Sequence, residues 1–557
     1  YQDNVPDDEV QIENWRNIMT QSLQIAKTYL IFLKNEKNPK CIEIAESLLN
    51  FAFNVEIDHT IESKIFSVLP ELGTFLNCNE PLFSLESSTG SGKTRCVPFF
   101  LSIRSFQENF QRPFIIMTQP STNIIDSKVR DFSNILKNVT ILREVDDIIQ
   151  FGQKSDISQP ILCLLTPYNA LILIERARSM NIDLFKKSRW ILDEVHDRTI
   201  FIDTIIGFLH QELNKIENFP CQITLMTATM DKSIQDSLGK QSKNIVLKDY
   251  TPYYVREIID SNNETRFIPS IATNHLFSIL EEMRNEIIEP GHILIFVAGN
   301  ADCQSILKDI AKMAELNNNE EGRKIMHIRP HFDEFSTEES IYQDIEREAY
   351  NPENLYIFPI QLAGYVSKVQ KSVAQNPLPK NLNNVIKIII STNIIESSIT
   401  ILDLAAVIDS GLYNRAKFDP ETEITKITKE SISKKMATQR RGRVGRTRKG
   451  VYVGISTGEY QDIEPQIKTS DLSASLLSLR YIGIKLENVE KLPDKPDCFQ
   501  VEQNINDLIT IGALDHKGNI TQKGREICNL SSDFSPFFAS VLLDIRNSTK
   551  SEYYEKL

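Results

Sequence analysis

The chain has 557 residues, of which 41% are hydrophobic and 25% are charged. This is the composition of an ordinary globular protein, and the length is too great for a single hydrophobic core, so we expect about three or four domains. No apolar run approaches the roughly 18 residues that a membrane-spanning helix needs. Residues 1–9 are acidic and contain no signal-peptide hydrophobic region. The sequence therefore indicates no membrane association.

The cysteines indicate the redox state of the compartment, and the net charge indicates how the protein would bind nucleic acid. Eight cysteines are scattered with no Cys-x-x-Cys pair, which argues against a zinc site or a disulfide framework and favours a reducing compartment. The net charge is −13, from 62 basic and 75 acidic residues, so indiscriminate coating of duplex nucleic acid is not expected. Residues 434–449, however, hold eight Lys or Arg and no acid. Such a local positive groove suits a protein that binds a single strand.

Helices are expected first along the chain, then an α/β domain. Residues 15–33 and 41–53 carry apolar residues at three- and four-residue spacing, so residues 1–75 are expected to form a helical segment. Residues 76–248 alternate short β-branched runs with helical stretches, which predicts a parallel sheet. The expected strands of this domain are residues 114–117, 161–165, 190–192 and 223–226.

A phosphate-binding loop is predicted at residues 87–94, Ser-Ser-Thr-Gly-Ser-Gly-Lys-Thr. A short apolar run precedes it and a segment that fits a helix follows, so backbone N–H groups and a helix N-terminus would surround an anion. Lys93 would reach the outer phosphates of a nucleotide, and the hydroxyl of Thr94 would ligate Mg²⁺. A surface loop rich in small residues is the alternative, since Ser87 stands where the usual pattern has glycine. The expected nucleotide-binding residues are Thr89, Gly90, Ser91, Gly92, Lys93, Thr94 and Arg95.

A second chemical signal lies about a hundred residues later. An apolar run at 189–192 ends in Asp193, Glu194 and, two residues on, His196. A carboxylate at the carboxyl end of a strand beside the phosphate loop can supply the second protein contact to Mg²⁺, and Asp193 suits this role. Glu194 is placed to orient and deprotonate a water molecule that attacks the γ-phosphate. A solvated loop edge is the alternative, but it does not explain why the pair terminates a hydrophobic run.

A second α/β domain is expected over residues 249–457, followed by helical segments. Polar residues 317–323 and the stretch 331–380 are expected to be insertions. Residues 458–530 are predicted to contain two helices, a Gly-Asn turn at 518–519 and an extended wing at 520–524. Residues 531–557 fit the first helix of a further domain that continues beyond the sequence. The strands expected in the second α/β domain are residues 293–297, 385–390, 405–408 and 450–455.

These segments resemble, in order, the motifs of the DExH branch of superfamily 2 helicases. Asp-Glu-Val-His at 193–196 is similar to the second motif, and Thr-Ala-Thr at 227–229 is similar to the third. The other matching segments are 114–120, 164–171, 292–299, 390–400 and 439–446. The last of these reads Gln-Arg-Arg-Gly-Arg-Val-Gly-Arg and resembles the sixth motif. Residues 407–434 and 469–514 resemble the DEAH/RHA group, and residues 418–427 within the first of these resemble its β-hairpin. The sixth motif and Met226 to Thr229 resemble viral helicases of the poxvirus and flavivirus kind.

The resemblance implies two tandem RecA-like P-loop domains with parallel sheets, an N-terminal helical segment and a C-terminal winged-helix domain. The implied boundaries are 1–75, 76–248, 249–457, 458–530 and 531–557. Nucleotide would bind between the two core domains. The implied catalytic residues are Lys93, Glu194, Gln439, Arg443 and Arg446, and the implied Mg²⁺ ligands are Thr94 and Asp193. The implied coupling residues are His196, Thr227 and Thr229, although His196 could equally be a structural histidine. The implied RNA-binding residues are Thr118, Gln119, Thr166, Thr392 and Asn393. Arg440 and Arg441 are expected to contact the bound RNA strand.

By this resemblance the chain is expected to be an RNA helicase that hydrolyses ATP or another NTP with Mg²⁺. It would move 3′-to-5′ on single-stranded RNA and unwind duplexes, as a monomer in the cytoplasm, a virion or a viral replication compartment. Proteins of a transcription or replication complex are possible partners. Three alternatives stay open: a nucleic-acid-stimulated NTPase or remodeller in a viral transcription complex, a DNA helicase, and a non-catalytic RNA-binding scaffold. The intact catalytic series argues against the scaffold.

Overall fold

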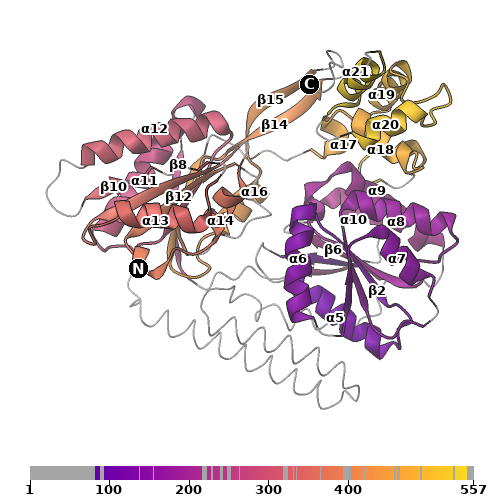
Figure 1. The fold of residues 1–557 in the computed structure, drawn as a ribbon, viewed down its shortest axis with the longest axis horizontal. Coiled ribbons are helices and arrows are strands. Elements are labelled where there is room, and N and C mark those ends of the chain that lie inside the picture. The colour runs from indigo at the N-terminus through magenta and orange to yellow at the C-terminus, as the bar shows by residue number, and fades with distance from the viewer. Residues whose placement is uncertain are drawn as a thin grey trace.

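The computed structural model describes residues 82–87, 93–136, 138–154, 156–215, 222–227, 230–238, 242–246, 253–261, 264–317, 324–329, 332–333, 335–363, 366–392, 401, 403–419, 422, 424–456, 460, 464–489, 492–530 and 534–548. The expected N-terminal helical segment lies outside the described residues. Within these ranges the chain forms two α/β domains, a long β-hairpin and a group of C-terminal helices (Figure 1).

The first core domain is built on a seven-stranded parallel sheet with the order β3-β4-β2-β5-β6-β1-β7. Its strands are β1 (Leu82–Glu86), β2 (Phe114–Thr118), β3 (Thr140–Leu142), β4 (Ile161–Leu165), β5 (Ser188–Leu192), β6 (Gln222–Thr227) and β7 (Ser242–Val246). Its helices are α5 (Lys93–Gln107), α6 (Thr122–Ile135), α7 (Val145–Gly152), α8 (Pro167–Ser179), α9 (Ile200–Lys215) and α10 (Lys232–Leu238). Because β2, β4 and β5 are buried throughout, they appear in the sequence as continuous apolar runs. The four strands expected here are confirmed.

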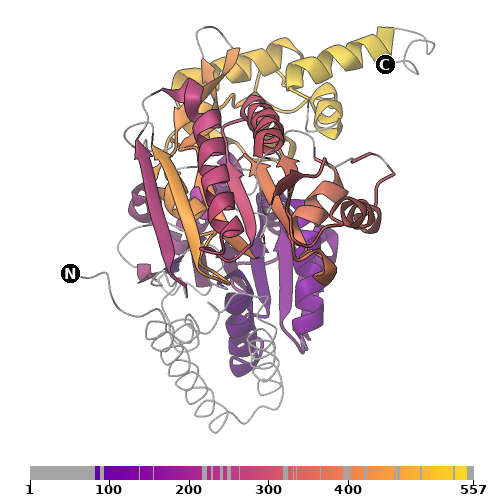
Figure 2. The ribbon, with the colours of Figure 1, turned by 90° about the vertical axis from the view of Figure 1, so that its left-hand side faces the viewer.

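The second core domain has a parallel sheet with the order β10-β11-β12-β9-β13-β16-β8. Its strands are β8 (Val255–Ser261), β9 (His292–Phe296), β10 (Ile325–His327), β11 (Leu355–Leu362), β12 (Val385–Ser391), β13 (Leu404–Asp409) and β16 (Gly450–Ser456). Its helices are α11 (Ile268–Arg284), α12 (Asn300–Asn317), α13 (Glu338–Glu348), α14 (Lys368–Gln375) and α16 (Lys434–Arg441). Figure 2 shows these strands and helices in front of the first core domain. The four strands expected here are also confirmed.

We expected the stretch 331–380 to be an insertion. It instead contains β11, an inner strand of the second sheet. Pro359 within β11 hides this strand in the sequence, since proline cannot donate a hydrogen bond to a neighbouring strand. The structure tolerates it because β10 pairs only with residues 355–357, so the later part of β11 has a partner on one side only, β12. Residues 318–323 of the expected polar insertion lie outside the described part of the chain.

An antiparallel hairpin, β14 (Leu412–Asp419) and β15 (Ile424–Ser431), extends from the second core domain toward the C-terminal helices (Figure 1). The C-terminal region comprises α17 (Gln466–Thr469), α18 (Ser473–Tyr481), α19 (Cys498–Thr510), α20 (Gln522–Asn529) and α21 (Pro536–Ser548). Its apolar side chains, among them Leu472, Leu476 and Leu508, belong to the same buried cluster as those of α8 and α9. The C-terminal region therefore packs on the first core domain.

The expected extended wing at 520–524 is mostly wrong. Extended pairing here is a single antiparallel bridge between Leu514 and Ile520, and α20 begins at Gln522. The side chain of Thr521 accepts a hydrogen bond from the backbone N–H of Gly524, so this residue caps a helix instead of continuing a strand. None of the helices in the described ranges is long and apolar enough to cross a membrane.

A buried ion pair fixes α16 to the second sheet. Nη1 of Arg440 lies 2.7 Å from Oδ1 of Asp409, at the end of β13, and both side chains are at most 1% exposed. The hydroxyl of Tyr452 donates to the other carboxylate oxygen of Asp409 at 3.1 Å, and the guanidinium lies over the ring of Phe296. Arg440 is thus an internal anchor and does not face RNA, contrary to our expectation for it.

We expect Asp409→Ala to lower the free energy of unfolding by about 3–5 kcal/mol, because it leaves a buried guanidinium without its carboxylate. Scanning calorimetry of the purified chain measures the change. Asp344→Ala on α13 is the control, since its pair with Arg347 is exposed and should contribute less than about 1 kcal/mol. Equal melting of the two variants would contradict the anchoring role.

Candidate active site

The carboxyl end of β1 and the start of α5 flank the predicted phosphate-binding loop. Lys93 is 3% exposed, and its Nζ donates a hydrogen bond to the backbone oxygen of Ser87 at 3.1 Å. The ammonium group therefore lies at the end of β1, beside Ser87. Residues 88–92, including Thr89, Gly90, Ser91 and Gly92, lie outside the described residues, as does the side chain of Arg95.

Asp193 receives hydrogen bonds from two elements of the same domain. The hydroxyl of Thr94 and the side-chain amide of Gln119 each donate to its Oδ2 at 3.0 Å. The strand order explains this meeting, because β5 lies between β2 and β6, and β6 pairs with β1. Burial and the adjacent Glu194 raise the pKa of Asp193 to about 6, while Lys93 acts in the opposite direction. The buried carboxylate of Asp193 is thus less readily ionised than an exposed one.

A hydroxyl and a carboxylate beside a phosphate position are the donor set that Mg²⁺ prefers, because it takes a few protein oxygens together with phosphate oxygens and water. The Thr94–Asp193 pair fits this ion, and the raised pKa of Asp193 reflects a carboxylate that a cation would stabilise. In the described parts of the chain there is no group of three or more His, Cys, Asp or Glu side chains that could hold a metal by themselves.

The short 3₁₀ helix η1 (Val195–Asp197) follows Asp193 and is bounded by two strained residues. Glu194 has φ = 53° and Arg198 has φ = 48°, both in the left-handed region that non-glycine residues avoid. Such conformations cost on the order of 1–3 kcal/mol each and persist only where surrounding contacts hold them. Glu194 and His196 thus lie on a strained loop whose conformation depends on contacts with the surrounding residues.

His196 connects this loop to the second core domain. Its Nε2 accepts a hydrogen bond from the side-chain amide of Gln439 on α16 at 3.2 Å. Its Nδ1 lies 3.3 Å from a carboxylate oxygen of Glu194. Burial lowers the pKa of His196 below its ordinary value, so the ring is neutral at pH 7. A path of polar contacts therefore runs from Glu194 through His196 to Gln439.

The basic segment 434–449 is not a continuous surface patch. Arg443 is 5% exposed, and the Nε of half-buried Arg446 donates to the backbone oxygen of Gly442 at 2.8 Å. Arg441 pairs with Glu257, and Arg448 pairs with Glu289. Several of these cations are thus used to build α16 and the turn after it, which places Arg443 and Arg446 next to the helix that carries Gln439.

The residues expected to contact RNA do not share one environment. Thr118 is fully buried and its hydroxyl accepts from the backbone N–H of Asp193 at 3.3 Å, while Gln119 is 2% exposed and bound to the same residue. The structure therefore brings both next to Asp193, in the predicted nucleotide site. Thr166 caps α8, and Thr392 is 9% exposed at the end of β12.

The third motif lies beside the phosphate loop, because the backbone oxygen of Thr227 accepts from the N–H of Ser87 at 3.0 Å. Thr229 and Asn393 lie outside the described residues. Arg198, whose contacts are described below, was missed in the sequence. The one signal that could have found it is its position two residues after the second motif.

Comparisons with known proteins agree with this geometry. Residues 74–237 match the family model of DEAD/DEAH box helicases. The chain is 27% identical over 456 residues to "ATP-dependent RNA helicase HrpA" of Borreliella burgdorferi, covering 80% of the chain and 48% of that protein. It is 26% identical over 467 residues to "Putative ATP-dependent RNA helicase L540" of Acanthamoeba polyphaga mimivirus, covering 82% and 60%. The chain thus spans about half the length of the curated relatives it matches.

A solved structure gives the fold. The crystal structure of Escherichia coli DEAH/RHA helicase HrpB matches with a TM-score of 0.59 at 22% identity, over 88% of this chain and 54% of that chain. The two parallel-sheet domains therefore have the tandem RecA-like helicase fold, as expected, and a C-terminal helical region accompanies them.

We expect Lys93→Ala to weaken binding of ATP roughly 10- to 100-fold, because hydrogen bonds to charged groups contribute about 1.5–3 kcal/mol. Equilibrium titration with a fluorescent ATP analogue in the presence of Mg²⁺ measures the affinity. The control is Lys186→Ala, an exposed lysine of the same domain. Unchanged affinity in a folded Lys93→Ala protein would rule out the phosphate-binding role.

Proposed function

We propose that this protein is an NTP-dependent RNA helicase of the DEAH/RHA type, which hydrolyses ATP or another NTP with Mg²⁺ and translocates 3′-to-5′ on single-stranded RNA. The observation that carries the proposal is the contact path from Glu194 through His196 to Gln439, beside the Thr94–Asp193 pair. It joins the expected general base of one core domain to the sixth motif of the other. The relatives named as ATP-dependent RNA helicases support RNA as the substrate.

In this mechanism the first core domain holds the phosphates with Lys93, while Thr94 and Asp193 would hold Mg²⁺, which would neutralise phosphate charge. Glu194 accepts a proton from the attacking water. Gln439 helps to orient that water, and Arg443 with Arg446 stabilises the charge that develops on the γ-phosphate. An arginine supplied in this way contributes on the order of 10³–10⁵-fold in rate.

RNA would lie across the carboxyl ends of both sheets. Phosphate contacts there fix the register of the strand without reading its bases. Thr166, Thr392 and Asn393 remain our candidates for these contacts, whereas the buried positions of Thr118 and Gln119 favour a role in linking strand to nucleotide. The hairpin β14–β15 exposes two apolar side chains of β15, Ile424 in the last pair before the turn at 56% and Ile427 further back at 71%, and we propose it as the wedge that separates duplex strands.

We propose that residues 458–530 form a small winged-helix domain whose wing is reduced to a single bridge. Helices α18, α19 and α20 pack together, and the Leu514–Ile520 bridge is the one extended feature between the last two. We further propose a monomer that acts in the cytoplasm or a viral replication compartment, in keeping with the viral kind of sixth motif and with a mimivirus relative. Proteins of a transcription or replication complex would be its partners.

Strand displacement tests this function. RNA duplexes with a 3′ or a 5′ single-stranded tail, and their DNA equivalents, are incubated with the protein, Mg²⁺ and ATP. We expect release only from 3′-tailed RNA duplexes. Glu194→Gln is the matched control, because it should bind ATP normally and lose turnover by at least about 10²-fold.

Each other outcome identifies a different function. Release from DNA duplexes would favour a DNA helicase. Tail-stimulated hydrolysis without release would favour an NTPase that remodels nucleic-acid complexes. Binding of RNA with no hydrolysis by the wild-type protein would contradict the enzymatic proposal and favour a scaffold.

A further inference from the structure

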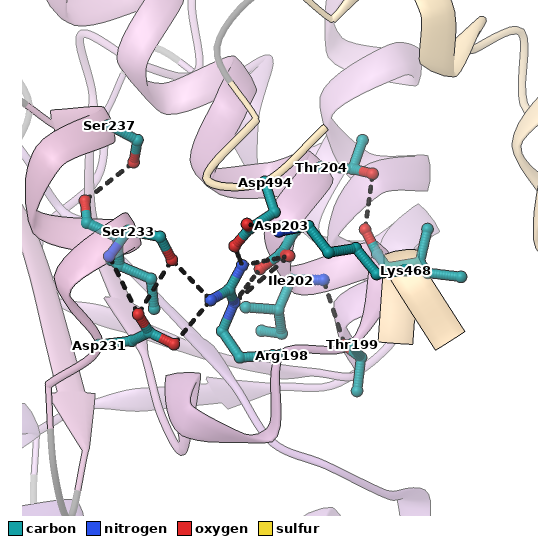
Figure 3. Close-up of polar contacts among 12 residues, drawn as sticks. Arg198, Thr199, Ile202, Asp203, Thr204, Asp231, Ser233, Ser237, Lys468 and Asp494 are labelled. Atoms are coloured by element: carbon teal, nitrogen blue, oxygen red, sulfur yellow. Dashed lines mark hydrogen bonds and ion pairs between the residues drawn. The ribbon is translucent and has the colours of Figure 1, made fainter. Parts of the chain in front are cut away.

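Arg198 uses all five N–H groups of its guanidinium in bonds to other side chains (Figure 3). Nε and Nη2 donate to the carboxylate of Asp203 at 3.0 Å each. Nη1 donates to Asp231 and Ser233, both at 2.8 Å, and Nη2 also donates to Asp494 at 2.6 Å. The arginine side chain is 6% exposed. A guanidinium has no further donor, so this site is saturated.

The three carboxylates come from three different parts of the chain. Asp203 lies on α9, directly after the loop that carries Glu194 and His196. Asp231 follows the third motif by two residues, just before α10. Asp494 belongs to the C-terminal region, in the segment that leads into α19 (Figure 3). One cation therefore joins the second motif, the third motif and the C-terminal region.

Arg198 also closes the strained loop of the active site. It is the residue with left-handed φ at the carboxyl end of η1, and Glu194 is its counterpart at the amino end. A residue in this conformation returns to a relaxed one unless its side chain is held, and the bonds of Arg198 hold it. The position of Glu194 and His196 thus depends on a contact set that includes the C-terminal region.

Asp494 is held in place by other contacts within the C-terminal region. Asp494 is 16% exposed and also pairs with Lys468 on α17. The apolar cluster shared by α8, α9 and the C-terminal helices lies beside it. A displacement of the C-terminal region would therefore move Asp494 and disturb its ion pair with Arg198.

We propose that Arg198 is a positioning residue that couples the C-terminal region, through Asp494, to the water-activating loop of the nucleotide site. The proposal rests on the function proposed above. Strain or motion that RNA imposes on the C-terminal region reaches Glu194 and His196 by this route, so the contact sets the rate of hydrolysis and not the affinity for nucleotide.

Asp494→Ala tests the coupling, because Asp494 touches neither nucleotide nor the γ-phosphate position. We expect kcat for RNA-stimulated ATP hydrolysis to fall about 10-fold, equal to about 1.4 kcal/mol in the barrier, with KM for ATP within about two-fold of wild type. Arg198→Lys should show the same split, since an ammonium cannot bridge three carboxylates in a fixed fork. Should Asp494→Ala fail to fold, the isosteric Asp494→Asn is measured with the same direction expected.

Lys468→Ala is the matched control. It removes the other partner of Asp494 on the same surface and leaves the five bonds of Arg198 intact, so kcat should stay within about two-fold of wild type. Wild-type kcat in folded Asp494→Ala, even with a lowered melting temperature, would show a merely structural contact and overturn the coupling. An equal loss of kcat in Lys468→Ala would also overturn it. Absence of hydrolysis in the wild-type protein would instead refute the proposed function.

Discussion

The proposed mechanism depends on one constraint, that the groups expected to act at a γ-phosphate are divided between two separate sheets. Lys93, Asp193 and Glu194 lie at the carboxyl end of the first sheet, and Gln439 lies on α16 of the second core domain. The hydrogen bond from Gln439 to His196 spans this interface. Because His196 is buried and neutral, it can accept that bond while its other nitrogen faces Glu194. Catalysis by these groups would require both domains to be in place at once.

Two buried arginines fix the positions of the elements that form the two halves of the site. Arg440 ties α16 to Asp409 at the end of β13, which fixes the helix that carries Gln439. Arg198 ties the strained loop after Asp193 to the C-terminal region. Arginine suits both places because its planar group forms several bonds in fixed directions and stays charged when buried. Helix α16 and the loop of η1 are thus held by ion pairs, while the sheets behind them are held by apolar packing.

Much of the fold could be predicted because parallel sheets bury their inner strands, and β2, β4, β5, β9 and β12 appear as apolar β-branched runs. Elements at or near the sheet edges, such as β3, β7 and β10, were missed because they are short or half exposed. The contact between Thr94 and Asp193 could be expected, because both belong to motifs that resemble those of one Mg²⁺ site. The burial of Arg440 and the contact of Arg198 with Asp494 could not be foreseen, since the partners lie 31 and 296 residues apart and only packing brings them together.

We propose that bound nucleotide and single-stranded RNA stabilise the interface at which Gln439 already meets His196. Energy transfer between fluorophores attached at Lys186 of the first core domain and Arg347 of the second measures this directly, since both side chains are exposed. With Mg²⁺, a non-hydrolysable ATP analogue and single-stranded RNA, the account predicts a higher transfer efficiency than in the free protein, and a smaller increase in Gln439→Ala. Transfer that does not change on adding both ligands would contradict the account.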